Sequence, residues 1–401
     1  MNLKLRPVHS HPLIHQGQPA IMLRDPLRLT DQVIILPQAL IPMLTLLDGE
    51  RDLDGLQASL MIRAGLNISR EDLAHIVDQL DQALLLHSPR FLEVSQTALD
   101  AYRRAPQRQP SSAGASYPAD PDALRALLDG YLADIPPTTP WSQGRGLISP
   151  HIDYERGGTV YAQVWARAAE FVRQAELAII LGTDHNGSDG QLTLTRQHYA
   201  TPYGLLPTAV EVVDGVAEAI GEAFAFEEEL HHLGEHSIEL AAVWLQHIRG
   251  GEPIEIVPIL CGSFQHFILT PFEPDQDERL NQALDVLRQV AAERPTVVIA
   301  AADLAHVGPA FGGATPIDFF GRAQLVADDN RLITSVCTGD AQGFYRQIEA
   351  EQDQRNVCGL APIYLTLRLL GETRGESAGY DRCPADNQGA SWVTICGVVL
   401  E

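Results

Sequence analysis

The sequence predicts an α/β protein, a layered sheet with flanking helices, preceded by a small helical or winged-helix-like module. The α/β prediction comes from the longer, second part of the chain, where short apolar runs of strand length alternate with longer runs of helical spacing. The smaller module is predicted from helical spacing near the N-terminus. A stretch without apolar periodicity, residues 105–112, separates the two parts.

The composition is that of an ordinary globular protein, with 401 residues of which 45% are hydrophobic and 20% charged. Lys and Arg number 28 against 52 Asp and Glu, so the formal net charge is −24. Such an acidic surface repels phosphates, and we expect neither nucleic acid nor membrane as a partner.

The five cysteines show no paired spacing, and we find no leader peptide or membrane span. A reducing cytoplasm is therefore the expected location.

Residues 1–104 are expected to form the small module. The apolar run 41–47 has helical character, and Leu53, Leu56 and Leu60 resume helical spacing after a polar turn. Ser69, followed by an acid three residues later, predicts the N-cap of a third helix. Over residues 27–92 this pattern resembles the PqqD-like peptide-binding modules.

Residues 105–112 are expected to be a linker. Their sequence, Ala-Pro-Gln-Arg-Gln-Pro-Ser-Ser, is rich in Pro and polar residues. We therefore interpret the basic residues in and near this stretch, Arg103, Arg104 and Arg108, as solvated. The large α/β domain then spans residues 113–401.

Five apolar runs of the large domain are predicted strands. They cover residues 146–149, 177–182, 255–260, 296–300 and 392–400. The segment 277–292 is a predicted helix, because its apolar residues form one stripe opposite its charged ones. We expect that stripe to pack on the sheet.

Several predicted strands end in a turn that carries a histidine. The first strand runs into Pro150 and His151, the second into Thr183, Asp184 and His185. One such histidine is more often structural, but two at the same topological place favour a functional pocket, because open α/β sheets put their sites at the carboxyl ends of strands.

The strand 296–300 leads to Asp303 and His306, three residues apart. One helical turn would place both side chains on the same face. The pair suits metal ligation, or a carboxylate that orients a general-base imidazole. The structural alternative is Asp303 as a helix N-cap.

Cys358 precedes an apolar helical run, where the helix dipole favours a thiolate. That position suits a metal ligand or a nucleophile, and the structural alternative is a small core residue. Glu235, His236 and Glu239 lie within about one turn of each other at the start of another helix and could line the same pocket. The remaining histidines of this region are interpreted as surface or structural residues: His231 and His232 as solvated, His198, His247 and His266 as structural.

Taken in order, these segments resemble the Memo family, whose bacterial and archaeal members are called AmmeMemoRadiSam system protein B. The resemblance is carried by residues 113–118, 150–151, 181–185, 235–239, 257–260, 303–308, 358–359 and 362–363. The family is similar in fold to class III extradiol dioxygenases, which hold Fe(II) with two histidines and a carboxylate.

The resemblance implies roles for particular residues. His151, His185 and Cys358 stand in the positions of ligands to one transition metal ion, iron, copper or zinc. His306 stands in the place of the dioxygenase's catalytic base, with Asp303 beside it. A thiolate in place of the carboxylate favours zinc, copper(I) or iron of altered potential.

The sequence departs from the family pattern at two acidic residues near these positions. Asp153 would either contribute a carboxylate to the pocket or bond Arg156, and Asp184 would act as an outer partner of the ligands.

Three functions remain as hypotheses. The first is a metal-dependent, redox-related protein that acts with a radical-SAM enzyme and an AMMECR-type partner, as the bacterial family name implies. The second is a module that binds a peptide or small-molecule ligand, recruited by the N-terminal part. The third is an extradiol-type iron dioxygenase in which Asp153 replaces the missing carboxylate. Whether the protein is an enzyme stays open.

Overall fold

The computed structural model describes residues 2–401, which form two compact units, residues 2–104 and Ala105–Glu401. Each unit has a hydrophobic core of its own.

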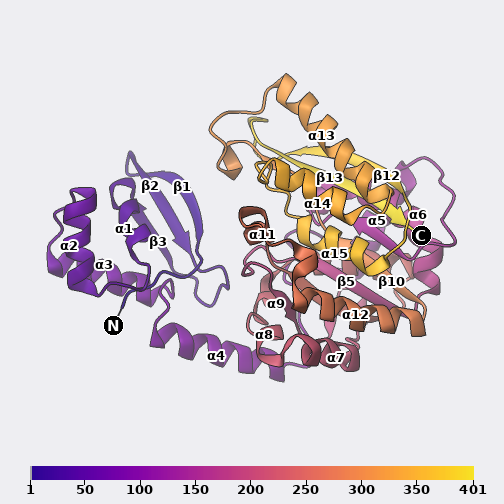
Figure 1. The fold of residues 1–401 in the computed structure, drawn as a ribbon, viewed down its shortest axis with the longest axis horizontal. Helices are drawn as coiled ribbons and strands as arrows, with labels where there is room; N and C mark the ends of the chain where they lie inside the picture. Colours follow the sequence, from indigo (N-terminus) through magenta and orange to yellow (C-terminus); the bar gives the residue numbers. More distant parts are fainter. Residues whose placement is uncertain (1) are drawn as a thin grey trace. The chain divides into compact units, whose positions relative to one another are not determined.

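The N-terminal unit combines a three-stranded antiparallel sheet, in the order β1-β2-β3, with four helices (Figure 1). Its elements are β1 (His9–His15), β2 (Gln18–Arg24), β3 (Val33–Pro37), α1 (Ile41–Leu46), α2 (Leu53–Ala64), α3 (Arg70–Gln82) and α4 (Pro89–Arg104). The predicted N-cap is confirmed, since the Ser69 hydroxyl accepts a hydrogen bond from the backbone N–H of Asp72 at 3.0 Å. The strands were not predicted, because β1 contains proline and three histidines and is mostly exposed.

The large unit is built on an eight-stranded sheet in the order β11-β13-β4-β10-β5-β9-β6, with β12 paired to β13. Four central strands, β4, β10, β5 and β9, are parallel to one another. The strands are β4 (Gly146–Ser149), β5 (Leu177–Thr183), β6 (Leu192–Leu194), β9 (Glu255–Cys261), β10 (Thr296–Ala301), β11 (His306–Val307), β12 (Gly375–Pro384) and β13 (Trp392–Leu400). The predicted α/β class and the five predicted strands are therefore confirmed.

Helices cover both faces of this sheet. On one face, α6 (Tyr154–Gln174) and α10 (Ser237–Ile248) contact the strands, and α5 (Pro121–Asp134) packs mainly on α6. On the other face, α7 (Val210–Ile220), α13 (Phe319–Cys337) and α15 (Leu360–Leu370) contact the strands. The helix α12 (Glu278–Glu293) packs mainly on α7 and α15, and α14 (Ala341–Ala350) packs mainly on α13 and α15. Figure 1 shows α12 and α15 in front of β5 and β10. Alternate residues of β5 enter the two cores, Ala178 and Ile180 on one side, Ile179 and Leu181 on the other.

Shorter elements connect these layers. They include the hairpin β7 (Tyr199–Thr201) and β8 (Gly204–Leu206), and the helices α8 (Glu222–Ala225), α9 (His231–Gly234) and α11 (Gln265–Leu269). Across the described chain, we find no helix with the length and apolar character needed to cross a membrane.

Residues 105–112 pack with the large unit, and the interpretation of Arg108 as solvated is wrong. Its side chain is fully buried and forms an ion pair with Glu239. Its backbone N–H donates to the carbonyl of His198 at 2.7 Å, and its carbonyl accepts from Ala200 at 2.9 Å. A polar, proline-containing segment looks like a linker in sequence, but these long-range partners fix it in place.

Candidate metal centre

The carboxyl ends of three adjacent parallel strands meet at one edge of the large sheet. His151 follows β4, Asp303 follows β10, and His185 follows β5, and these strands are neighbours in the order β4-β10-β5. Cys358 reaches the same place from the turn before α15. The order of the strands in the sheet therefore brings together residues that lie more than 200 positions apart in the sequence.

His151, His185 and Cys358 form a group whose ligand atoms all lie within 4.8 Å of one another. The Cys358 Sγ lies 3.3 Å from Nε2 of His151. His151 is buried, while a third of the His185 side chain is exposed. The group thus has one open side, and the structure brings together the three residues that the family resemblance implied as ligands.

Both imidazole rings are held by hydrogen bonds from their Nδ1 atoms. Nδ1 of His151 donates to the carbonyl of Ala301 at 3.0 Å, and Nδ1 of His185 donates to the Glu235 carboxylate at 2.9 Å. When either ring is neutral, its lone pair therefore lies on Nε2, the nitrogen left for a metal. Metal-binding histidines are usually oriented by such a bond on the opposite nitrogen.

Glu235 bonds two histidines at once. One of its carboxylate oxygens accepts from His185, and the other lies 3.0 Å from Nδ1 of His236. The His236 ring stacks on that of His185, with centroids 5.0 Å apart, and lies edge-on to His151 at 5.5 Å. Glu235 and His236 therefore belong to the pocket, as their spacing had suggested.

The charges in the group reinforce one another. Burial disfavours the thiolate, but His151 and His306 outweigh it and hold the pKa of Cys358 well below its ordinary value. Burial likewise opposes the imidazolium of His151, but Asp303 and Cys358 raise the pKa of His151 to about 9. Partial desolvation would lower the pKa of His185, yet Glu235 and Cys358 raise it well above the ordinary value. Without a metal, the lowered pKa of Cys358 and the raised pKa values of the two histidines favour a thiolate beside imidazolium rings.

Asp303 and His306 do not share a helical turn. The strand β10 ends at Ala301, and the chain runs as a loop to His306, which begins β11. The Asp303 carboxylate accepts from the backbone N–H of His151 at 2.8 Å, so it is not a helix N-cap. Nδ1 of His306 lies 3.2 Å from the carbonyl oxygen of Leu304. The helical-face expectation is therefore wrong, although both residues border the site.

Asp153 does not supply a carboxylate to the pocket. It caps α6 by accepting from the backbone N–H of Arg156, and it forms an ion pair with the Arg156 guanidinium. Of the two alternatives for this residue, the structure shows the bond to Arg156. The idea that Asp153 replaces the missing dioxygenase carboxylate is therefore wrong.

The interpretation of His231 and His232 as solvated is also wrong. The Asp184 carboxylate accepts a hydrogen bond from Nδ1 of His231 at 2.8 Å. Asp184, which was expected to support the metal ligands, thus bonds His231. His232 is fully buried, and burial lowers its pKa to about 3. Nothing in the acidic run before these histidines signals their burial, because the partners come from distant segments such as Asp184 and Tyr199.

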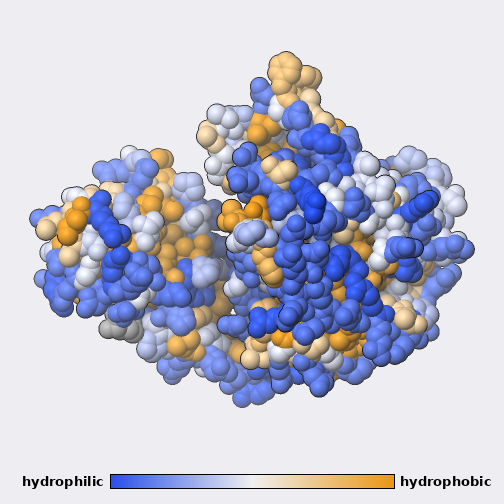
Figure 2. Space-filling model, in the orientation of Figure 1, coloured by the Kyte–Doolittle hydropathy of each residue, from blue (hydrophilic) through white to orange (hydrophobic). Residues whose placement is uncertain are grey.

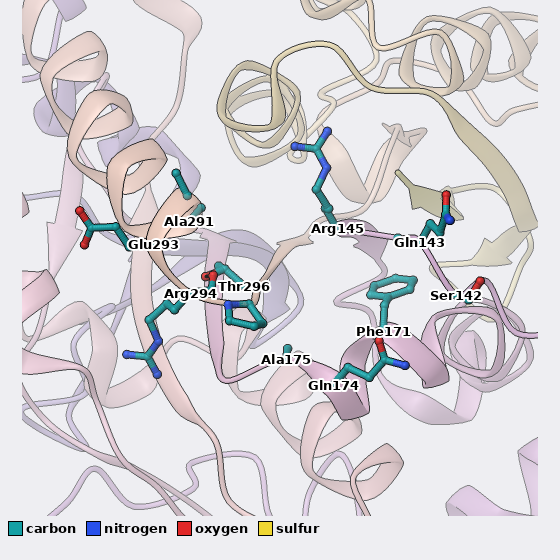
Figure 3. A pocket seen from close by; sticks show the side chains of 13 residues that line it. Ser142, Gln143, Arg145, Phe171, Gln174, Ala175, Ala291, Glu293, Arg294 and Thr296 are labelled. Atoms are coloured by element: carbon teal, nitrogen blue, oxygen red, sulfur yellow. Dashed lines mark hydrogen bonds between the residues drawn. The ribbon is translucent and has the colours of Figure 1, made fainter.

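A pocket of about 260 Å³ opens onto the group. Its lining includes His185, Cys358, Asp184, Phe264 and Asn356. A larger hollow of about 410 Å³ lies at the opposite, amino-terminal ends of β4 and β10 (Figure 3). Figure 3 shows its two arginines, Arg145 and Arg294, on separate chain segments and not converging on one point.

The donor set at the carboxyl end fits a transition metal. Two imidazole nitrogens and one thiolate are ligands that suit zinc, copper and iron. Two neighbouring groups also have metal-ligand character. They are His185 with Glu235 and His236, and Asp184 with Glu228 and His231. Of these three groups among residues 2–401, the one around Cys358 alone includes a sulfur ligand.

Comparison with known proteins adds a family context. A family model described as Memo-like protein matches residues 108–389. A MEMO1 family protein of Aquifex aeolicus is 22% identical over 385 residues, covering 94% of this chain and 95% of the relative. MEMO1 family proteins of Methanopyrus kandleri and Methanosarcina barkeri are 27% and 26% identical, and each covers 68% of this chain and 91% of the relative. The two archaeal relatives therefore match a share of the chain close to that of the large unit alone.

Proposed function

The chain belongs to the Memo family, and from that premise we propose that it binds one transition metal ion through His151, His185 and Cys358. The observation that supports this most directly is the convergence of the three ligand atoms within 4.8 Å. The orientation of both imidazoles by Nδ1 hydrogen bonds adds to it.

The thiolate favours zinc, copper(I) or iron of altered potential as the bound ion. When bound, copper or iron would supply one-electron chemistry, which is the basis of the proposed redox role. The chain's own residues would hold the ion, orient the ligands and leave the pocket side free for a small ligand. Asp303 bonds the backbone of His151, and the charge of His306 acts on the Cys358 thiolate, so these two residues are proposed to handle protons at the ligands.

Metal analysis of protein purified under aerobic and anaerobic conditions tests this proposal. We expect one ion per chain in the wild type and a loss of that ion in His185→Ala. The matched control is His75→Ala, which replaces an exposed histidine of the N-terminal unit. This variant should retain the metal. Equal metal content in wild type and His185→Ala would contradict the proposal.

The proposed partners, a radical-SAM enzyme and an AMMECR-type protein, come from the family resemblance. Co-purification from cells that express both partners with this protein would test them. We expect a complex that survives gel filtration, and separate elution of all three proteins would argue against it.

A second proposed function is peptide binding by the N-terminal unit. Its sheet leaves β3 at an edge, and hydrophobic side chains gather over its strands in Figure 2. Val33 and Ile35 of β3 and Ile14 of β1 are exposed apolar residues. An edge strand with exposed apolar side chains suits the addition of an extended peptide as a further strand.

A charge on the edge strand tests the peptide-binding proposal. We expect Ile35→Lys to abolish binding of extended apolar peptides from a display library, with Met61→Lys on α2 as the control, because Met61 is exposed but lies on a helix. If both variants bind the selected peptides as the wild type does, the edge of β3 is not the binding surface.

A further inference from the structure

We infer that Arg108 is a positioning residue of the candidate metal centre: it holds the turn that carries Glu235, and Glu235 orients His185 and His236. The inference rests on the proposed metal site and assigns to it a residue that acts through Glu235.

The Arg108 guanidinium joins three points around the start of α10. Its Nε donates to the carbonyl of His232 at 2.8 Å, and its Nη2 donates to the carbonyl of Glu235 at 2.8 Å. Its Nη1 donates to the carboxylate of Glu239 in the first turn of α10. The Arg108 side chain therefore bonds α9, the turn after it and the first turn of α10 at once.

The local chemistry requires an arginine. The carbonyls at the end of a short helix such as α9 have no partner within the helix. A guanidinium offers five donors in a fixed planar arrangement, so it can satisfy two carbonyls and a carboxylate together. A lysine ammonium would keep the charge but has a single nitrogen, which cannot reach all three points.

Glu239 holds the Arg108 guanidinium in this position. Its carboxylate is fully buried and also accepts from the Tyr117 hydroxyl at 2.5 Å and from the backbone N–H of Ser112 at 2.9 Å. Arg108 balances its charge, and the Tyr199 ring lies 4.8 Å below the guanidinium. A buried charge pair with this many hydrogen bonds has one favoured geometry.

The contact is transmitted to the metal ligand through Glu235. Its backbone carbonyl is held by Arg108, while its two carboxylate oxygens hold His185 and His236. The same carboxylate accepts from the backbone N–H of Ser237 at 3.0 Å, and the Ser237 hydroxyl donates to the carbonyl of Thr183, two residues before His185. A shift of the turn would therefore move both rings.

The other end of α10 offers a matched control. Arg249 donates from Nη1 to the carbonyls of Val172, Arg173 and Ala175, at 2.7, 3.2 and 3.1 Å. Arg249 is the C-cap residue of α10 and ties that end of the helix to carbonyls at the end of α6, far along α10 from Glu235. Arg249→Lys thus makes the same change at a helix-end arginine that bonds several carbonyls, without touching the turn.

The experiment compares Arg108→Lys and Arg249→Lys with the wild type in two measurements. Zinc affinity is measured by competition with a chelator, and the Nδ1–H resonances of His185 and His236 are recorded by NMR in metal-free protein. We expect zinc affinity to fall about tenfold in Arg108→Lys, as for other outer partners of metal ligands. We also expect both histidine resonances to shift in that variant. Arg249→Lys should match the wild type in both measurements, although both variants lose thermal stability.

The outcomes separate the two proposals. If the wild type binds no zinc and also contains no copper or iron in the metal analysis, the metal proposal fails, and the histidine resonances alone decide the role of Arg108. Zinc affinity within twofold of wild type together with unshifted resonances in Arg108→Lys would overturn the inference. If Arg108→Lys does not fold, the double variant Arg108→Gln/Glu239→Gln carries the same test, because it removes both buried charges together.

Discussion

The two ends of the parallel strands differ in the hydrogen-bond partners of their polar side chains. At the amino ends, Arg145 donates to the carbonyls of Glu372 and Glu401, and Arg294 donates to the carbonyl of Glu176 and the Glu255 carboxylate. At the carboxyl ends, the Nδ1 atoms are bonded while the Nε2 atoms and the Cys358 thiol converge. The larger hollow lies at the amino ends and the reactive groups at the other. The chemistry of the lining, and not the volume, therefore locates the site.

Of the substitutions at the two ends of the strands, removal of the Cys358 thiol should have the largest effect on metal affinity. Cys358→Ser leaves two imidazoles and a weak hydroxyl ligand, so we expect metal affinity to fall by more than roughly 100-fold, beyond the effect of losing an outer partner. Affinity is measured by chelator competition. Cys337→Ser, a half-buried cysteine at the end of α13, should bind metal as the wild type does.

Loss of the shared carboxylate should have the next largest effect. Glu235→Gln removes the charge that orients His185 and His236, and we expect a 10- to 100-fold loss of affinity, on the order found for outer partners of metal ligands. Glu227→Gln, an exposed acid of the same region, removes equal charge without these bonds. If both variants lose affinity equally, the effect comes from overall charge and not from orientation.

The pH dependence of metal binding should follow from the charges of the metal-free group. The raised pKa values of His151, about 9, and of His185 mean that metal must displace protons from imidazolium rings. Affinity should therefore rise with pH through the neutral range, about tenfold per unit for each proton displaced. Calorimetry in buffers of different protonation enthalpy counts these protons, and a result of none would exclude the imidazolium form.

Stability of the metal-free protein should show the opposite signs for thiol and imidazole. The depressed pKa of Cys358 contributes stability above the unfolded-state pKa of roughly 8.5, and this is lost as pH falls through the folded-state pKa. The raised pKa of His151 contributes stability that is lost as pH rises toward about 9. Thermal unfolding of wild type and Cys358→Ser across this range should therefore differ in its pH dependence.

A substitution at the amino ends should have the smallest effect. Arg294→Ala removes a partly exposed ion pair, and we expect it to lower stability by about 1 kcal/mol or less. Metal affinity should be unchanged, because the site lies at the other end of the strands. A loss of metal binding in this variant would break the contrast between the two ends.

Local signals predicted much of the fold. The boundaries 146–149 and 392–400 agree with β4 and β13, because a run of apolar residues between polar turns is itself the strand signal. Helix N-caps such as Ser69 were predicted from residues that bond within one turn. Elements without such a signal, β1 to β3, were missed.

The sequence by itself determined the α/β class, the order of the strands along the chain and the histidines at their ends, because periodicity and turn residues act over a few neighbours. Only the tertiary structure decided which side chains meet. Cys358 lies beside His151, 207 residues away, and Arg108 pairs with Glu239 across 131 residues. Burial and charge depend on such distant partners, so the same arginine that looks solvated in sequence is fully buried in the fold.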